Sequence, residues 1–95
     1  MNQPRTSIII PSYRGEAKLP TLLNALSQQS DTDFEAVVVI DGLLDNSPEI
    51  IDSFASQGVP VRTVVLEQNQ GRVAALNAGF SAAKGQVLVR CDDDL

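Results

Sequence analysis

Four short runs of apolar, mostly β-branched residues recur along the chain. They cover residues 7–11, 34–40, 61–66 and 87–91. Each run is almost continuously apolar, which is typical of a strand whose two faces are both covered, as in a parallel sheet. The pattern therefore predicts four buried strands.

Between these runs lie three segments in which apolar residues recur every three or four positions, the spacing of an amphipathic helix. The apolar positions are Leu19, Leu22, Leu23 and Leu26 in the first segment, Ile50, Ile51 and Phe54 in the second, and Val73, Leu76, Phe80 and Ala83 in the third. Each of the three segments is therefore predicted to be a helix.

Turn and cap residues agree with this assignment. Pro20 suits the first turn of the first helix. Ser47 is expected to cap the second helix, with Pro48 at the next position. Gly58 and Gly85 each stand where a helix is expected to end.

Strands that alternate with helices predict parallel strands joined by right-handed crossovers. We expect an α/β fold, a Rossmann-like parallel sheet with flanking helices and, numbering the strands along the chain, the order 3-2-1-4. No linker or repeat divides residues 1–95, so they form a single domain, and a partial one. The fourth strand would be an apolar edge at residues 87–89, so we expect a chain that is cut short and that self-associates through this edge.

The charge of the chain narrows the function classes. The 95 residues hold 7 Lys+Arg against 12 Asp+Glu, a net charge of −5, which argues against a nucleic-acid partner. No histidine is present, which excludes imidazole catalysis and histidine metal ligands. No apolar run approaches the ~20 residues of a membrane span. The lone Cys91 fits a reducing compartment. A cytoplasmic location is expected, including the cytoplasmic membrane face for a longer protein.

Polar residues follow each predicted strand at its carboxyl end, where open α/β sheets bind ligands. The candidates are Pro11, Ser12 and Tyr13 after the first strand, Asp41 after the second, Arg72 after the third, and Asp92, Asp93 and Asp94 after the fourth. Because the carboxyl ends of parallel strands meet at one rim, we expect these residues to share a site.

The candidate residues suggest a cation and a nucleotide. Carboxylates without histidine or cysteine suit Mg²⁺ or Mn²⁺. Asp92 and Asp94 would point to the same side of an extended segment. Asp41 could accept hydrogen bonds from a base or a ribose hydroxyl. Arg72, at a helix start, could meet a base or a phosphate.

Simpler interpretations stay open for each residue. The acids at 92–94 could be a solvated charge run or the cap of a later helix. Asp41 with Gly42 could be only a turn, and Arg72 a surface charge. Lys18 is interpreted as a surface charge. Tyr13 could stack on a ligand or simply pack a loop.

Five blocks of sequence occur in a set order. They are residues 7–14 (SIIIPSYR), 37–42 (VVVIDG), 45–47 (DNS), 69–79 (NQGR through ALNAG) and the stretch from Gly85 to the acids at 92–94. Together they resemble the N-terminal donor half of a family 2 glycosyltransferase with the GT-A fold, from Ser7 to Asp94.

The resemblance implies transfer of a sugar from a nucleotide-diphosphate donor, with a UDP-sugar favoured, to a glycan, lipid or protein acceptor. It places Pro11, Ser12 and Tyr13 beside the nucleotide, Asp41 at the uracil or ribose, Arg72 at the base, Asp94 at a divalent cation on the diphosphate, and Asp92 and Asp93 at the ribose or the waters of the metal, Asp92 being the second candidate metal ligand. No catalytic residue is expected in this chain, because the family's catalytic base lies in the acceptor half. The chain alone is therefore expected to be inactive.

Ile40 stands where the family usually has a first acid, and Leu43 and Leu44 replace small polar residues. These departures affect nucleotide selection. They also keep an alternative open, a non-catalytic nucleotide-binding or regulatory α/β module. A receiver module would need acids after the first strand, and a dinucleotide-binding domain a Gly-x-Gly-x-x-Gly turn, and neither is present.

Overall fold

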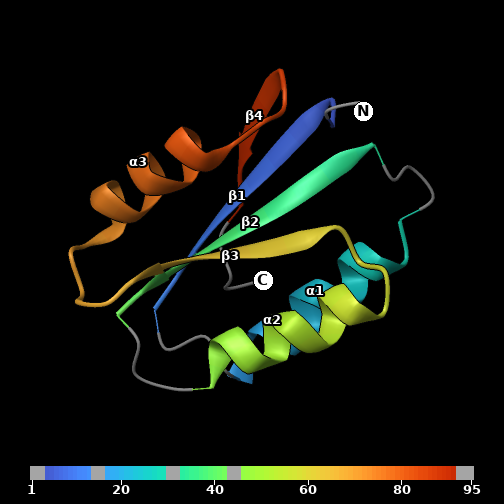
Figure 1. The fold of residues 1–95 in the computed structure, drawn as a ribbon, viewed down its shortest axis with the longest axis horizontal. Helices are drawn as coiled ribbons and strands as arrows, with labels where there is room; N and C mark the ends of the chain where they lie inside the picture. Colours follow the sequence, from blue (N-terminus) through green and yellow to red (C-terminus); the bar gives the residue numbers. More distant parts are fainter. Residues whose placement is uncertain (1–3, 14–16, 30–32, 43–45, 92–95) are drawn as a thin grey trace.

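The computed structural model describes residues 4–13, 17–29, 33–42 and 46–91. In these ranges strands and helices alternate in the order β1 (Thr6–Ser12), α1 (Leu19–Ser27), β2 (Phe34–Asp41), α2 (Ser47–Ser56), β3 (Val61–Leu66), α3 (Arg72–Ala82) and β4 (Val87–Arg90). The four strands form one parallel sheet in the order β3-β2-β1-β4 (Figure 1). The predicted fold class and strand order are confirmed.

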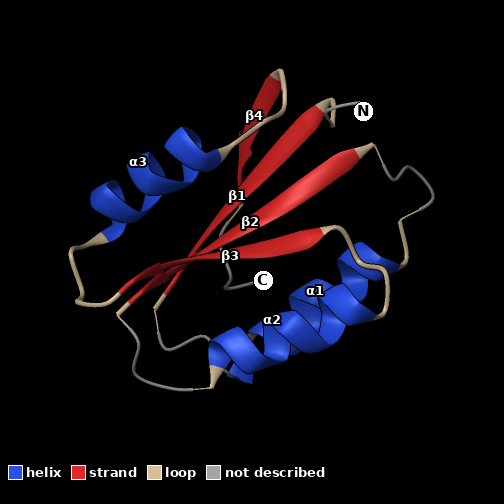
Figure 2. Ribbon diagram, in the orientation of Figure 1, coloured by secondary structure: helices blue, strands red, loops and turns tan. Residues whose placement is uncertain are grey.

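The sheet lies between two helical layers, with α1 and α2 on one face and α3 on the other (Figure 2). Alternate residues of β2 divide between the two cores: Val38 packs with the leucines of α1, whereas Val37 packs with Ala75 of α3. All eight residues of β2 are buried. The prediction that residues 34–40 form a strand covered on both faces is therefore confirmed.

Helix α3 lies close to the sheet at Gly79. A Cβ atom added there would overlap Cγ2 of Ile9 and lie 3.0 Å from Cγ2 of Val39. A larger residue would therefore push α3 away from β1 and β2. The small residue brings the beginning of α3, at Arg72, toward the carboxyl ends of these strands.

The helix ends correct two of the sequence predictions. The carbonyl of Asn46 accepts the first helical bonds, from Glu49 and Ile50, so α2 is capped at Asn46 and Ser47 is its buried first residue. Gly58 follows α2 with φ 97°, as predicted. The prediction for Gly85 is wrong, because α3 ends at Ala82.

Strands β3 and β4 are the outer strands of the sheet. On β4 the side chains of Val87, Leu88 and Val89 are 46%, 47% and 42% exposed. The predicted apolar edge is therefore present, while self-association through it stays a prediction. Within the described ranges, no helix has the length and apolarity that crossing a membrane requires.

Candidate functional site

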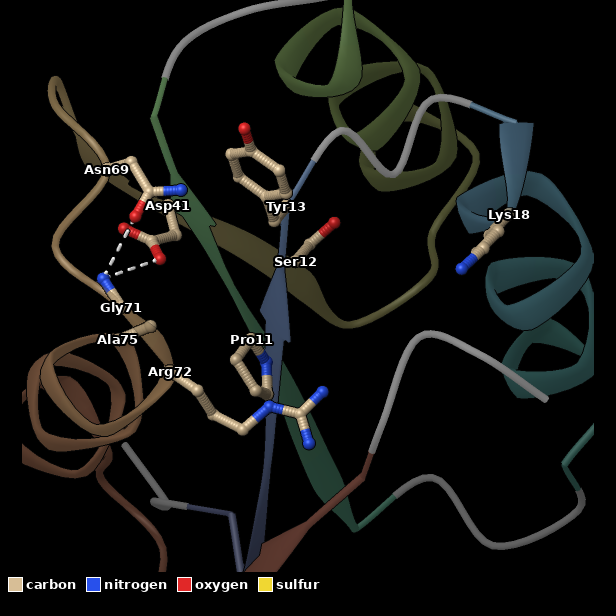
Figure 3. Close-up of a pocket in the computed structure, with 9 residues that line it drawn as sticks. All are labelled: Pro11, Ser12, Tyr13, Lys18, Asp41, Asn69, Gly71, Arg72 and Ala75. Atoms are coloured by element: carbon tan, nitrogen blue, oxygen red, sulfur yellow. Dashed lines mark hydrogen bonds between the residues drawn. The ribbon is translucent and has the colours of Figure 1, made fainter.

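A pocket of about 320 Å³ lies at the carboxyl end of the sheet (Figure 3). It is lined by Pro11, Ser12, Tyr13, Lys18, Asp41, Asn69, Gly71, Arg72 and Ala75. All five predicted site residues that the structure describes are among them. The other three, Asp92, Asp93 and Asp94, lie outside the described residues.

The end of β1 supplies one wall of the pocket. Pro11 and Ser12 are buried, and Tyr13 is 49% exposed. The hydroxyl of Ser12 is buried and has no hydrogen-bond partner among the described residues. An unsatisfied buried hydroxyl costs about 1–3 kcal/mol, so Ser12 is suited to bond a group that enters the pocket.

The carboxylate of Asp41 connects the end of β2 to the beginning of α3. Its Oδ1 accepts the Gln70 N–H at 2.7 Å, and its Oδ2 accepts the Gly71 N–H at 3.0 Å. Asp41 is only 4% exposed. These bonds hold the helix start that carries Arg72, so Asp41 organises the pocket wall. Its direct contact with a base or ribose stays a prediction.

Two glycines let the loop after β3 pack against the end of β2. Gly42 has φ 97°, donates its N–H to the Leu66 carbonyl at 2.9 Å, and would place a Cβ atom 3.3 Å from the Asn69 nitrogen. Gly71 has φ 95°, and its N–H also bonds Oδ1 of Asn69 at 3.1 Å. Residues that carry a side chain rarely adopt either of these backbone conformations. The loop is therefore tied tightly to the pocket.

Among the described residues that line the pocket, positive side chains outnumber negative ones. Lys18 and Arg72 enter it from α1 and α3, on either side of β1 (Figure 3). Asp41 is the only acid among the lining residues that the structure describes, and its oxygens already accept two N–H bonds. Although the chain carries a net charge of −5, this pocket suits an anionic group.

Sequence reasoning missed Lys18, which was interpreted as a surface charge. The structure places it at the N-cap position of α1, where the chain returns from the rim at Tyr13. Its position two residues before Pro20, a residue typical of a helix start, was the available signal. A residue at the start of the first helix is expected at the same rim as the strand ends.

The predicted metal site falls outside the part of the chain that the structure describes. Within residues 4–13, 17–29, 33–42 and 46–91, no group of three or more acids or cysteines is arranged to hold a metal ion. The candidate ligands Asp92 and Asp94 lie beyond these ranges.

Several proteins with similar sequences are named as glycosyltransferases or as transferases of a specific sugar. The chain is 40% identical over 93 residues to the undecaprenyl-phosphate 4-deoxy-4-formamido-L-arabinose transferase of Aeromonas hydrophila, covering 94% of this chain and 28% of that protein. It is also 40% identical over 88 residues to an uncharacterized glycosyltransferase of Haemophilus influenzae, covering 93% and 29%. The chain thus spans less than a third of these relatives.

Two solved structures share the fold. TarS 1-349 of S. aureus in complex with UDP-GlcNAc superposes with a TM-score of 0.87 and 30% identity, covering 95% of this chain and 26% of that one. The mannosyltransferase PcManGT of Pyrobaculum calidifontis, in complex with GDP-Man and Mn²⁺, has a TM-score of 0.87 at 24% identity, covering 99% and 28%. Because the identity to PcManGT is only 24%, this second similarity supports the fold alone.

The sequence profile described as Glycosyl transferase family 2 matches residues 7–95, which is nearly the whole chain. This match agrees with the parallel sheet and with the resemblance carried by the five sequence blocks. The chain therefore belongs to glycosyl transferase family 2.

Proposed function

We propose that this chain is the donor-binding part of an enzyme that transfers a sugar from a nucleoside-diphosphate sugar, with a UDP-sugar favoured. The observation that carries the proposal is the pocket at the carboxyl end of the sheet, which is lined by two cationic side chains, Lys18 and Arg72, and by Asp41, whose carboxylate is already hydrogen-bonded. A diphosphate is the part of such a donor that matches this charge. The UDP-GlcNAc complex of the related TarS supports the choice of nucleotide.

Within the pocket each side chain has a proposed task. Arg72 and Lys18 attract the diphosphate or, for Arg72, the base. Tyr13 stacks on the base or packs beside the ribose, and the hydroxyl of Ser12 bonds a polar group of the nucleotide. Pro11 shapes the wall, and Asp41 holds the start of α3 and contacts the base or ribose edge.

The acids after β4 are proposed to hold a divalent cation, Mg²⁺ or Mn²⁺. Oxygen ligands are what these hard cations prefer, and Asp94 and Asp92 are the proposed ligands, with Asp93 beside the ribose. When bound, the cation would neutralise charge on the departing diphosphate. The proposal rests on the sequence of the triplet and on its place after the strand beside β1.

The reaction is proposed to be a direct displacement at the anomeric carbon. An acceptor oxygen forms the new bond as the bond between that carbon and the diphosphate oxygen breaks, and the nucleoside diphosphate leaves. A hydroxyl acceptor would give its proton to a base outside this chain, whereas a phosphate acceptor attacks through an oxygen that is already ionised. A lipid phosphate is the favoured acceptor, because several relatives are named for undecaprenyl phosphate, and it would place the reaction at the cytoplasmic membrane face.

Calorimetric titration of UDP-GlcNAc tests the proposal in a protein that contains this chain and has the length of its relatives. We expect binding that strengthens about tenfold or more when Mn²⁺ is added, and loss of that gain in Asp94→Ala. Asp52→Asn, an exposed change on α2, is the matched control. Equal binding with and without metal would refute the metal role. The 95-residue chain alone should bind without turnover.

The alternative is a module that binds a nucleotide without catalysis. It is favoured by Ile40, which stands where the family usually has an acid, and by Asp41, whose two oxygens already bond backbone N–H groups. Transfer of labelled sugar to a polyprenyl phosphate by the longer protein would exclude this alternative. Nucleotide binding without transfer to any tested lipid, glycan or protein would favour it.

A further inference from the structure

A second polar cluster lies far from the pocket, at the amino end of the sheet. The carboxylate of Glu35 on β2 accepts three hydrogen bonds, from the Ser7 hydroxyl at 2.6 Å, from Arg62 Nε at 2.8 Å and from the Lys84 N–H at 2.7 Å. Glu35 is only 9% exposed. A buried carboxylate with three donors is a strong tether, because hydrogen bonds to ionised groups are the strongest ones in proteins.

The tether continues from Glu35 to the chain that enters β4. The Ser7 hydroxyl accepts the Gly85 N–H at 2.8 Å. A Cβ atom at Gly85 would lie 2.7 Å from the Ser7 nitrogen, so only glycine allows this approach. Arg62 also donates to the carbonyl of Ala82, the last residue of α3. The turn between α3 and β4 is therefore fixed to three strands at once.

Strand β4 has little packing of its own to determine its alignment. All four of its residues are exposed, and among the described residues its neighbour in the sheet is β1, at the pairs from Thr6↔Val87 to Ile9↔Arg90. A strand with one buried face resists slipping, because a shift of one residue would turn its apolar side chains to water. Strand β4 lacks this safeguard in the described structure, so another feature must determine its register.

We propose that Ser7, Glu35, Arg62 and Gly85 form a register anchor that determines how β4 aligns with β1. The anchor also has a consequence at the opposite end of the sheet, and this consequence rests on the proposed function. A one-residue slip would shift the end of β4 by about 3.3 Å and exchange its faces. The residues that follow Cys91 would then start from the wrong place. Glu35 and Gly85 are thus positioning residues for the donor site, which they do not touch.

Amide hydrogen exchange and cross-strand NOEs on this chain test the anchor. The variants are Glu35→Gln, Ser7→Ala and Gly85→Ala, and the exposed changes Asp52→Asn and Ser53→Ala on α2 are matched controls. We expect protection of the Val87 and Cys91 amides, which bond the carbonyls of Arg5 and Ile9, to fall about tenfold or more.

The same experiment separates an anchor from a general loss of stability. In each variant the protection of the Val37 and Val39 amides on β2 should fall at least about tenfold less than that of the β4 amides, and the NOEs between backbone protons of the paired residues Ile8 and Val89 should weaken. Unchanged protection of β4 in Glu35→Gln and Gly85→Ala would overturn the proposal, and so would an equal loss on β2 and β4. If Glu35→Gln does not fold, Ser7→Ala is judged by these criteria.

The readout does not depend on the proposed function. If the parent chain and its variants all failed to bind UDP-GlcNAc while β4 lost protection as expected, the anchor would stand and the donor site would fall. In the longer protein, the anchor variants should lose most of the gain in UDP affinity that Mn²⁺ provides, and retain metal-free UDP binding within about threefold.

Discussion

Gly71, the residue that precedes α3, donates its N–H to Oδ2 of Asp41 at 3.0 Å, across 30 positions of sequence. The bond closes the pocket wall, because the end of β2 and the start of α3 are held by one carboxylate. The carboxylate thus contributes to folding before any ligand arrives.

Asp41→Asn is therefore expected to weaken both folding and binding. The amide of asparagine would present N–H to one of the two backbone donors, which leaves a buried group unsatisfied at a cost of about 1–3 kcal/mol. Urea denaturation measures the loss, with Asp52→Asn as the control. Unchanged stability together with lost UDP binding would show instead that Asp41 is a pure ligand contact.

The stability of the chain is expected to fall in acid through Glu35. Burial raises the pKa of Glu35, but hydrogen bonds from the Arg62 and Ser7 side chains and from the Lys84 N–H, together with the charge of Arg62, lower it more, so the pKa lies below the ordinary value of 4.5. A carboxyl whose pKa is lower in the folded chain stabilises it at pH values above 4.5, and that contribution is lost as the pH falls through the folded-state pKa.

Urea denaturation across that acidic range measures the effect. Glu35→Gln should be less stable than the parent by about 2 kcal/mol at neutral pH, and the gap should shrink in acid, where the parent carboxyl is protonated as well. Asp52→Asn should retain the parent's pH dependence. A gap that stays constant down to acidic pH would contradict the role of the Glu35 charge.

Removing either cation of the pocket should weaken donor binding without unfolding the chain. Arg72 and Lys18 are both exposed, so Arg72→Met and Lys18→Met should change the free energy of unfolding by less than about 1 kcal/mol. Each should lower the affinity for UDP about tenfold and reduce its dependence on salt. Lys84→Met, outside the pocket, is the control. Affinity unchanged in Lys18→Met would remove that residue from the site.

Ser12→Ala separates ligand binding from folding. The Ser12 hydroxyl has no partner among the described residues, so its removal should leave the free energy of unfolding within about 0.5 kcal/mol of the parent, or raise it. Affinity for UDP should fall severalfold if the hydroxyl bonds the nucleotide. Calorimetry measures the affinity, and Ser53→Ala is the control. Loss of stability without loss of affinity would contradict the expected role.

The exposed strand β4 predicts self-association of this chain. Val87, Leu88 and Val89 form an apolar edge, and no other strand in the described part of the chain pairs with its outer side, so it is a template for another strand. Sedimentation should detect dimers or larger species that Val89→Lys reduces. A well-folded monomer at high concentration would refute the prediction.

Much of this architecture was readable from the sequence. The alternation of apolar runs with helical spacing predicted the parallel sheet, and the strand order followed from assigning that sheet to the Rossmann-like class. Because the carboxyl ends of parallel strands meet at one rim, the same pattern predicted that Pro11, Ser12, Tyr13, Asp41 and Arg72 would line one pocket. The strands, the helices and their shared rim follow from the local period of the chain and the handedness of its connections, whereas the strand order also needs the fold class.

Only the tertiary structure decided what some of these side chains do. It showed Lys18 in the pocket, the oxygens of Asp41 bonded to the Gln70 and Gly71 amides, and Glu35 joined to Arg62 across 27 positions. Such contacts depend on strand register and on how closely helices approach the sheet, which no local pattern encodes. A side chain's partner is determined by packing between distant segments, whereas its place on a strand or helix is determined by its neighbours in sequence.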